Sequence, residues 1–407
     1  MAGEQSASNV IVAIKRESSP GVAAGATGAE RMRIFDSDGL RLETTPVESS
    51  EKRADGNKEG SRHGSRIVPG GYNHPLVPGG FMDILLEAIM RSTWAAEITT
   101  TEADLTSLAI ASNVLTAGSG SLITEGFRVG QVIYLTGMTE TENNNRNLLI
   151  TAVTASTMTV ATTDGVALTD ESADTTFEIV RRGNVVNAAA PVKYHHTIEQ
   201  RDVDHNRSEQ FLGVKLVGLS LTLAPNSPVT VASTWMGLNR VLLDTGESPY
   251  FTTPALVTGR VKVGEEILLR ANGATVAKAT SLTLGWGITA AGQPVLGSRL
   301  SPDIFDNDLA LTGQVSKIRE SHDFLTLYDG ETEFEVATVL EERTAAAPYP
   351  CIGLFFPIVK LMSGGAPVGG GDGPKIETFD MDFHTKPAGV TGYDATIASI
   401  SSSGVAA

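Results

Sequence analysis

The chain has 407 residues, 41% of them hydrophobic and 19% charged, so it can form a packed core and is not globally disordered. Its net charge of −16 argues against binding nucleic acid through phosphate neutralisation, which requires a basic surface. The single cysteine, Cys351, excludes a disulfide within the chain, and 42 glycines together with many Thr and Ser residues indicate a turn-rich β protein.

The N-terminal part is predicted to be extended. Residues 1–50 alternate short extended runs with the small-residue linker SSPGVAAGATGAE. The polar run at 51–66 is either a solvated loop or a loop that contacts an acidic partner, which could be another copy of the chain. We therefore predict an extended arm or loop at 1–30 and at 51–70. The basic residues of interest there are Lys52, Arg53, Lys58, Arg62 and Arg66.

Nothing in the sequence indicates a membrane protein. The N-terminus lacks the basic start and long apolar segment of a signal peptide. The longest apolar runs, FMDILLEAIM and PCIGLFFPIV, are too short or too interrupted to span a bilayer. We expect a soluble protein, made in a cytoplasm, that does not contact a membrane.

One convincing helix is predicted within residues 79–97, GGFMDILLEAIMRSTWAAE. Its apolar stripe, which we expect to pack on a sheet as the core face of this helix, comprises Phe81, Ile84, Leu85, Ala88 and Ile89. Asp83, Glu87 and Arg91 are expected on another face, with Glu87 and Arg91 forming a favourable i, i+4 ion pair.

Residues 99–183 differ from the rest of the chain. They contain no lysine, are rich in Thr and Ser, and show short strands at even spacing with turn signals between them. We predict a small β-barrel or sandwich inserted into a discontinuous main domain of residues 1–98 and 184–407.

A long bulged strand is predicted at 211–225, FLGVKLVGLSLTLAP. Alternate positions are apolar, but the phase slips by one residue near Gly218. The first set is Leu212, Val214 and Leu216, and the second is Leu219, Leu221 and Leu223. A slip of one residue moves the apolar set to the opposite face of a strand, and a β-bulge at Gly218 is the expected cause. Further strands follow almost to the C-terminus, where we expect the tail ASISSSGVAA to be frayed.

The sequence offers little chemistry. The stretch HHTIEQRDVDH suggests a metal site that would use His195, His196 and Asp204, yet its spacing fits no standard ligand pattern, and a polar turn with cross-strand charge pairs is favoured. No nucleophile elbow, Cys pair or dinucleotide fingerprint is present. We therefore expect no catalytic residues, no cofactor and no metal, and not an enzyme.

The order of several motifs resembles the tail tube proteins of long-tailed, non-contractile bacteriophages. They are RMRIFDSDGLRLETTPVESSEKRADG, VPGGFMDILLEAIMRSTW, the long segment from YHHTIEQRDVDH to TVASTWMG, SLTLGWGI, ALTGQVSKI and LFFPIVKLM. The resemblance covers most of residues 30–98 and 183–395, and leaves the insert unmatched. It implies a mainly β, sandwich or barrel-like subunit with one flanking helix.

The resemblance also implies a virion component. Six copies would form a ring, and stacked rings would form a tube that conducts double-stranded DNA without binding it specifically. The bulged strand, with the two apolar sets and Gly218, would join strands of neighbouring subunits, and the five basic residues of the polar run would contact the next ring. Partners would be further copies, the tape measure protein, tail chaperones, and the tail terminator and distal tail proteins. The insert would face outward.

One alternative from another class is a surface adhesion or decoration module of a virion, because small Thr-rich β-domains like the insert serve that purpose. In that case removal of 99–183 would abolish binding but leave folding intact.

Overall fold

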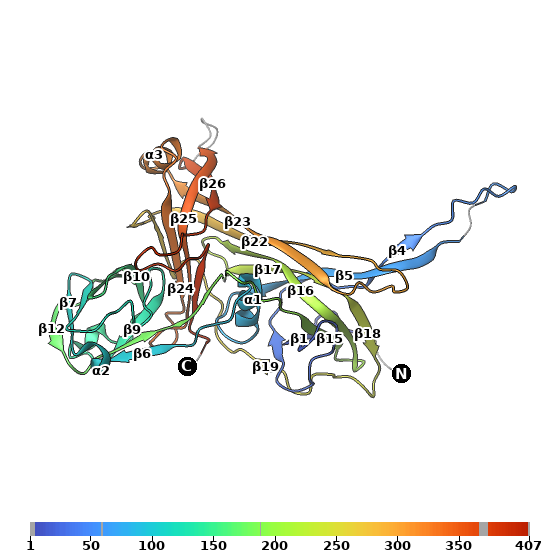
Figure 1. Cartoon of the computed structure of the whole chain (residues 1–407), viewed down its shortest axis with the longest axis horizontal. Coiled ribbons are helices and arrows are strands. Elements are labelled where there is room, and N and C mark those ends of the chain that lie inside the picture. The colour runs from blue at the N-terminus through green and yellow to red at the C-terminus, as the bar shows by residue number, and fades with distance from the viewer. Residues whose placement is uncertain (1–4, 58–59, 188, 366–372, 406–407) are drawn as a thin grey trace.

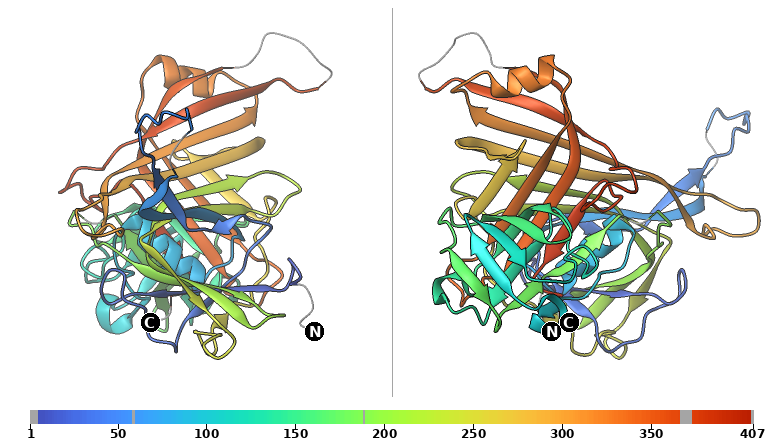
Figure 2. Two further views of the ribbon diagram at one scale, coloured as in Figure 1. Left: turned by 90° about the vertical axis from the view of Figure 1, so that its right-hand side faces the viewer. Right: turned by 60° about the vertical axis from the view of Figure 1, so that its left-hand side comes forward.

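The computed structural model describes residues 5–57, 60–187, 189–365 and 373–405, and they form a mainly β protein (Figure 1). The main domain is a β-sandwich and barrel-like arrangement of curled sheets, as predicted, with the insert beside it. Two further views show the long C-terminal strands crossing the upper half of the molecule (Figure 2).

The first sheet lies near the N-terminus. Its strands, in spatial order, are β18 (Asn239–Leu243), β16 (Arg207–Leu223), β15 (His196–Asp202), β1 (Val10–Arg16), β2 (Glu30–Met32) and β19 (Ala255–Leu256). All neighbours are antiparallel except β19 and β2. We call this the flanking sheet.

The second sheet is larger and shares β16 with the first. Its spatial order is β5 (Arg62–Pro75), β17 (Thr230–Gly237), β16, β22 (Ala279–Gly292), β23 (Ile304–Ile318), β26 (Ile376–Phe383), β25 (Cys351–Gly365), β24 (Phe334–Glu341), β20 (Ile267–Ala271) and β21 (Ala274–Thr275). Short strands extend its edges: β3 (Gly39–Leu40) and β4 (Glu43–Val47) pair with β5, and β27 (Ser399–Ser402) joins β25 to β14 (Gly183–Val186). We call this the main sheet.

The insert forms its own antiparallel sheet. The strand order is β12 (Glu171–Asp174), β7 (Leu108–Ala111), β8 (Val114–Ala117), β11 (Thr157–Thr162), β10 (Leu148–Val153), β9 (Val132–Thr136), β13 (Glu178–Arg181) and β6 (Ile98–Thr101). A four-residue helix, α2 (Glu102–Leu105), and a 3-10 turn at Thr141–Asn143 lie in its connections.

Helix α1 (Phe81–Met90) is shorter than the predicted segment, because Arg91 adopts a left-handed conformation with φ 54° and ends it. Four of the five residues of the predicted stripe are buried, and Ile84 is half-buried against the same core. The polar face was predicted wrongly. Asp83 is buried and accepts a hydrogen bond from Ser402 Oγ at 2.9 Å, and Arg91 turns away from the helix to pair with Asp306.

Two further elements differ from the prediction: one helix was not predicted, and one strand lies where a frayed tail was expected. Helix α3 (Asp323–Asp329) caps one end of the main sheet, where Phe324 packs into the core. The C-terminal tail, expected to be frayed, forms the fully buried strand β27 between β14 and β25. Strand pairing on both edges therefore fixes this segment, although its Ser-rich sequence carries little apolar signal.

Two extensions project beyond the rest of the molecule (Figures 1 and 2). One is the arm, residues 43–57 and 60–67, in which β4 pairs with the first part of β5. Part of the polar run is therefore a strand and not a loop. The other is the hairpin tip, residues 293–303 between β22 and β23. They meet at their bases, where the Arg66 amide donates to the Arg299 carbonyl at 2.8 Å.

Candidate assembly surfaces

Three rungs on the outward face of four adjacent long strands carry only small or uncharged residues. Residues that pair directly across β17, β16, β22 and β23 point to the same side of the sheet. They form three rungs: Thr234, Gly218, Gly287 and Ala310; Ala232, Ser220, Gly285 and Thr312; Thr230, Thr222, Thr283 and Gln314. We call these residues the small-residue face. The alternate residues, such as Leu219, Trp286 and Leu311, point into the core on the other side.

The small-residue face is hollowed, with a depression of about 260 Å³ over the first two rungs. Gly287 lies within it. A Cβ atom at Gly287 would meet nothing within 4 Å, so local packing does not require glycine there. Its φ also lies outside the left-handed region. Glycine inside a strand weakens the strand, and where packing and conformation do not demand it, it often marks a place where another molecule can approach the backbone closely.

An acidic margin borders this face on β26. Asp382 pairs with Thr312 and Asp380 with Gln314, so both carboxylates continue the rungs. Gln314 Nε2 donates to Asp380 Oδ1 at 2.8 Å. A hydrogen bond from Ser363, and then the one from Gln314, lowers the pKa of Asp380, so this carboxylate is charged at neutral pH.

Strand β16 passes from the flanking sheet into the main sheet within the predicted bulged segment. Its register against β17 shifts between Leu216 and Gly218, so Val217 is the extra residue at this point. This bulge absorbs the slip in the apolar pattern, because Leu216 before it and Leu219 after it are both buried in one core. The rest of the two predicted sets is buried there too, except Leu212, which is half-buried.

A second irregularity in β16 was not predicted. Its register against β15 shifts near Gly213, which has φ +63°. The Gly213 amide donates to the buried carboxylate of Glu17 at 2.8 Å, and Thr197 Oγ1 donates to the same oxygen at 2.9 Å. Burial raises the pKa of Glu17, although these hydrogen bonds oppose the rise. The bend of β16 therefore rests on a glycine conformation and a buried acceptor.

A buried ion pair holds Lys215, two residues after Gly213 in β16. Lys215 Nζ donates to Asp306 Oδ1 at 2.9 Å and lies 3.4 Å from Asp303. Asp306 lies near the start of β23, and Asp303 is the residue just before that strand. Burial alone would raise the pKa of Asp306, but Lys215 and Lys193 hold it below its usual range. This contact ties the base of the hairpin tip to the bend in β16.

The predicted basic residues lie along the arm. Lys52, Arg53 and Arg62 are exposed, and Arg53 pairs with Asp55 at 3.1 Å within the arm itself. Arg66 is half-buried at the base of the arm, and Lys58 lies outside the described residues. The structure thus places the four described residues on one extension, apart from the predicted strand residues of β16.

The insert is joined to the main sheet by a shared core. Val339, Cys351 and Phe355 of β24 and β25 are buried in one cluster with the apolar residues of the insert. Burial raises the pKa of the Cys351 thiol to about 11, so the thiol is protonated at neutral pH.

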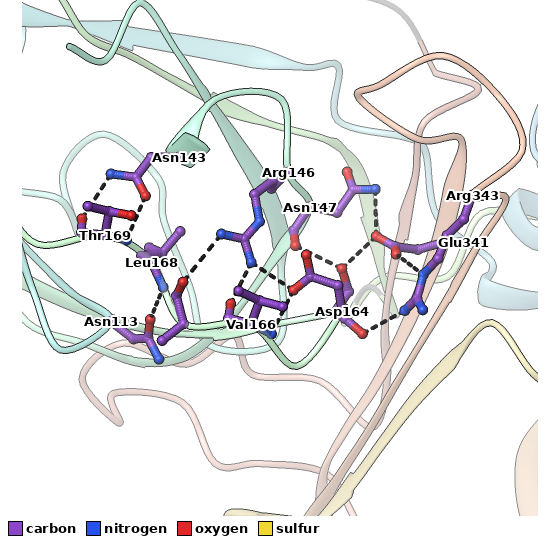
Figure 3. Close-up of polar contacts among 12 residues, drawn as sticks. Asn113, Asn143, Arg146, Asn147, Asp164, Val166, Leu168, Thr169, Glu341 and Arg343 are labelled. Atoms are coloured by element: carbon purple, nitrogen blue, oxygen red, sulfur yellow. Dashed lines mark hydrogen bonds and ion pairs between the residues drawn. The ribbon is translucent and has the colours of Figure 1, made fainter. Parts of the chain in front are cut away.

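A polar contact closes the same junction (Figure 3). Asn147 Nδ2 and Thr163 Oγ1, both of the insert, donate to Glu341 Oε1 at 2.8 and 2.7 Å. Arg343 Nη2 donates to the Thr163 carbonyl at 2.8 Å and its Nε lies 3.3 Å from Glu341 Oε2. Sequence reasoning missed this junction, because the two sides are far apart in the chain.

The histidine-rich stretch does not converge on a metal site. His195 Nε2 lies 2.8 Å from Asp303, whereas His196 is buried with its ring edge-on to Trp235. Asp204 accepts from the Ser6 amide at 2.8 Å, on the exposed edge near the N-terminus. Among the described residues, no group of three or more His, Cys, Asp or Glu side chains is placed to hold a metal ion.

No helix within the described ranges is long and apolar enough to cross a membrane.

The small-residue face had a signal in the sequence. In LSLTL and TLGWG, large apolar residues alternate with Ser, Thr or Gly, so one face of each strand is bulky and the other is small. Nothing in the sequence showed that these faces would be adjacent, since β16 and β22 are separated by more than fifty residues.

Comparison with known proteins identifies the family. A family model described as phage tail tube protein matches residues 7–383, which includes the flanking sheet, the insert and nearly all of the main sheet. No curated protein matches the chain. The predicted resemblance is thereby confirmed at the level of the family: the chain belongs to the phage tail tube proteins, which are structural components of the virion tail and not enzymes.

Proposed function

We propose that this chain is the tail tube subunit of a long-tailed, non-contractile (siphovirus-type) phage. Six copies form a ring, rings stack into a hollow tube, and genomic DNA passes through the lumen. The small-residue face lines the lumen, with the Asp380 and Asp382 margin supplying negative charge. The observation that carries this proposal is Gly287, which leaves the centre of an exposed sheet free of side chains although the space around it is open.

A polyanion is expected to slide over such a face. Hydroxyl and glycine surfaces give it no cation to bind, and like charge along the margin opposes adsorption. Within the described residues, the twelve members of the face include no lysine or arginine. The apolar side of the same strands packs on the core that contains α1, so only one side of this sheet is available for the lumen.

Other surfaces have other roles in this proposal. The exposed basic residues of the arm contact the next ring, where the neighbouring copy is acidic. Strand β16 and its neighbours extend the wall from copy to copy. In the part of the chain that the structure describes, the apolar core of the insert continues into β20, β24 and β25 and into none of the four strands of the face, which favours a position outside the tube. The tape measure protein, chaperones, and terminator and distal proteins act at the lumen and the tube ends.

The experiment is electron microscopy of the purified chain combined with a DNA-binding assay. We expect the unmodified chain to form rings or tubes that do not bring down double-stranded DNA on sedimentation. Gly287→Lys should still assemble, because the added side chain has room, and should retain DNA. Gly287→Glu is the matched control and should assemble without retaining it. A chain that stays monomeric at high concentration, or a Lys variant whose tubes ignore DNA, would contradict the proposal.

A further inference from the structure

We propose that the hairpin tip of one copy docks into an apolar groove of the next copy, with Leu296 as the inserted side chain. This inference rests on the proposed function, because it names one contact by which copies of this chain assemble. It concerns a different part of the molecule from the small-residue face and the arm.

The hairpin tip carries the apolar side chains that insert into the next copy. Leu296 is 104% exposed and Val295 is 43% exposed, so two adjacent apolar side chains point into solvent at the end of a projecting hairpin. Isolated exposed apolar residues are common, but adjacent ones at the tip of an extension suit insertion into a partner. Arg299 follows on the same tip, and among the described residues its guanidinium has neither an ion pair nor a hydrogen bond.

The hairpin tip docks into a groove of about 200 Å³ between β20 and β22. Its apolar lining comprises Leu223, Pro225, Ile267, Leu269, Val276 and Leu282. The groove exists because β16 pairs with β22 only as far as Leu223 opposite Leu282, so that edge of β22 faces open space at residues 279–281. An apolar cavity of about 150 Å³ can hold a benzene molecule, so this one has room for a leucine side chain.

The mouth of the groove carries charges of both signs. Lys278 lines the groove and pairs with Glu320. Glu265 is exposed beside Gly264, which lines the groove. Its carboxylate accepts the Asn226 amide at 2.7 Å and has no ion pair among the described residues. An unpaired cation on the tip and an unpaired anion at the groove are the charges that such a docking would bring together.

The two partners lie at opposite ends of one strand, so the contact joins different copies. Strand β22 has 14 residues, and at about 3.4 Å per residue it separates groove and tip by roughly 45 Å. The tip of one chain therefore cannot reach its own groove. Each copy would offer one tip and one groove, and such a head-to-tail contact propagates into rings or filaments and does not stop at a dimer.

The test is disulfide trapping with Leu296→Cys and Thr280→Cys, since Thr280 lines the groove. The native Cys351 is fully buried and gives no background. After assembly and mild oxidation, the double variant should give a ladder of covalent multimers. A one-to-one mixture of the single variants should stop at dimers, and each single variant alone should give none. Dimers from Leu296→Cys alone would instead show a tip-to-tip contact and overturn the inference.

A second variant makes the result independent of thiol chemistry. Leu296→Asp should raise the concentration needed for assembly by about tenfold, the effect of losing one buried leucine. Val166→Asp, at a 62% exposed apolar residue of the insert, is the control and should leave it unchanged. Tubes that form normally with Leu296→Asp would refute the docking and leave the proposed function standing. Failure of the unmodified chain to assemble would refute both.

Discussion

Gly213 is a position of β16 where a side chain is disfavoured for two reasons. Its φ of +63° is accessible to glycine and strained for other residues, and a Cβ atom there would lie 2.5 Å from Leu238 Cδ1. Gly218, only five residues on, has neither restriction, since its nearest neighbour would be Thr234 Cβ at 3.4 Å. The two glycines therefore bend the strand for different reasons.

We predict that Gly213→Ala lowers the free energy of unfolding by about 2–4 kcal/mol, because a strained φ and a steric clash add to the loosened bond with Glu17. Gly218→Ala should change it by no more than about 1 kcal/mol. Urea denaturation of both variants measures the difference. Equal effects would mean that the backbone at Gly213 relaxes without penalty.

Sequence reasoning at this scale found the slip in the apolar pattern and the bulge at Gly218, but it missed the strained backbone at Gly213. Alternation of side chains reports which face a residue occupies, and the phase shift near Gly218 follows directly from it. The alternation of apolar and polar side chains gives no information about a positive φ. At Gly213 it depends on the partner strand β15 and on Glu17, which lies almost two hundred residues away.

Among the elements, the insert forms its own sheet but shares a hydrophobic core with the main sheet. Within the described residues its strands pair among themselves, yet its core continues into β24 and β25. Excision of 99–183 would expose Cys351 and Phe355, so the structure argues against the expectation that its removal leaves folding intact. The buried β27 was missed for a related reason, since its burial comes from neighbours distant in the chain.

We predict that Glu341→Ala lowers the free energy of unfolding by about 1–3 kcal/mol, because Asn147 and Thr163 each lose a buried acceptor and Arg343 loses its ion pair. Asn147 keeps the Tyr349 carbonyl as an acceptor and Thr163 keeps the Asn147 carbonyl, which limits the loss. Glu333→Ala, an exposed carboxylate just before the same strand, is the matched control and should have an effect within about 0.5 kcal/mol. Chemical denaturation measures both, and reactivity of Cys351 toward a thiol reagent reports whether the junction has opened.

At the scale of the whole molecule, charge and self-assembly act against each other. Every copy carries −16, so copies repel one another at neutral pH, while the groove and the hairpin tip favour contact through apolar burial. The fold class and the family were evident from motif order, because a mainly β pattern with one amphipathic helix extends over the chain. The proposed head-to-tail contact was not, because it depends on where β22 extends beyond its pairing with β16 and leaves its edge uncovered.

We predict that assembly accelerates as sodium chloride rises from about 50 mM to about 500 mM, since the Debye length falls from roughly 14 Å to roughly 4 Å and repulsion is screened. Light scattering at a fixed protein concentration measures the rate, and potassium chloride serves as a control for ion identity. Slower assembly at high salt would show that ion pairs of the arm outweigh the repulsion.

The membership of β16 in both sheets has a mechanical consequence. One unbroken backbone runs from the flanking sheet through two bulges into the small-residue face, and Lys215 clamps it midway to the base of β23. A pulling force on the flanking sheet would reach the small-residue face through the covalent backbone of β16. It would not depend on hydrogen bonds between strands, which can break one after another. When a tube of such subunits bends, each subunit should therefore stay rigid. The deformation should occur at the interfaces between copies.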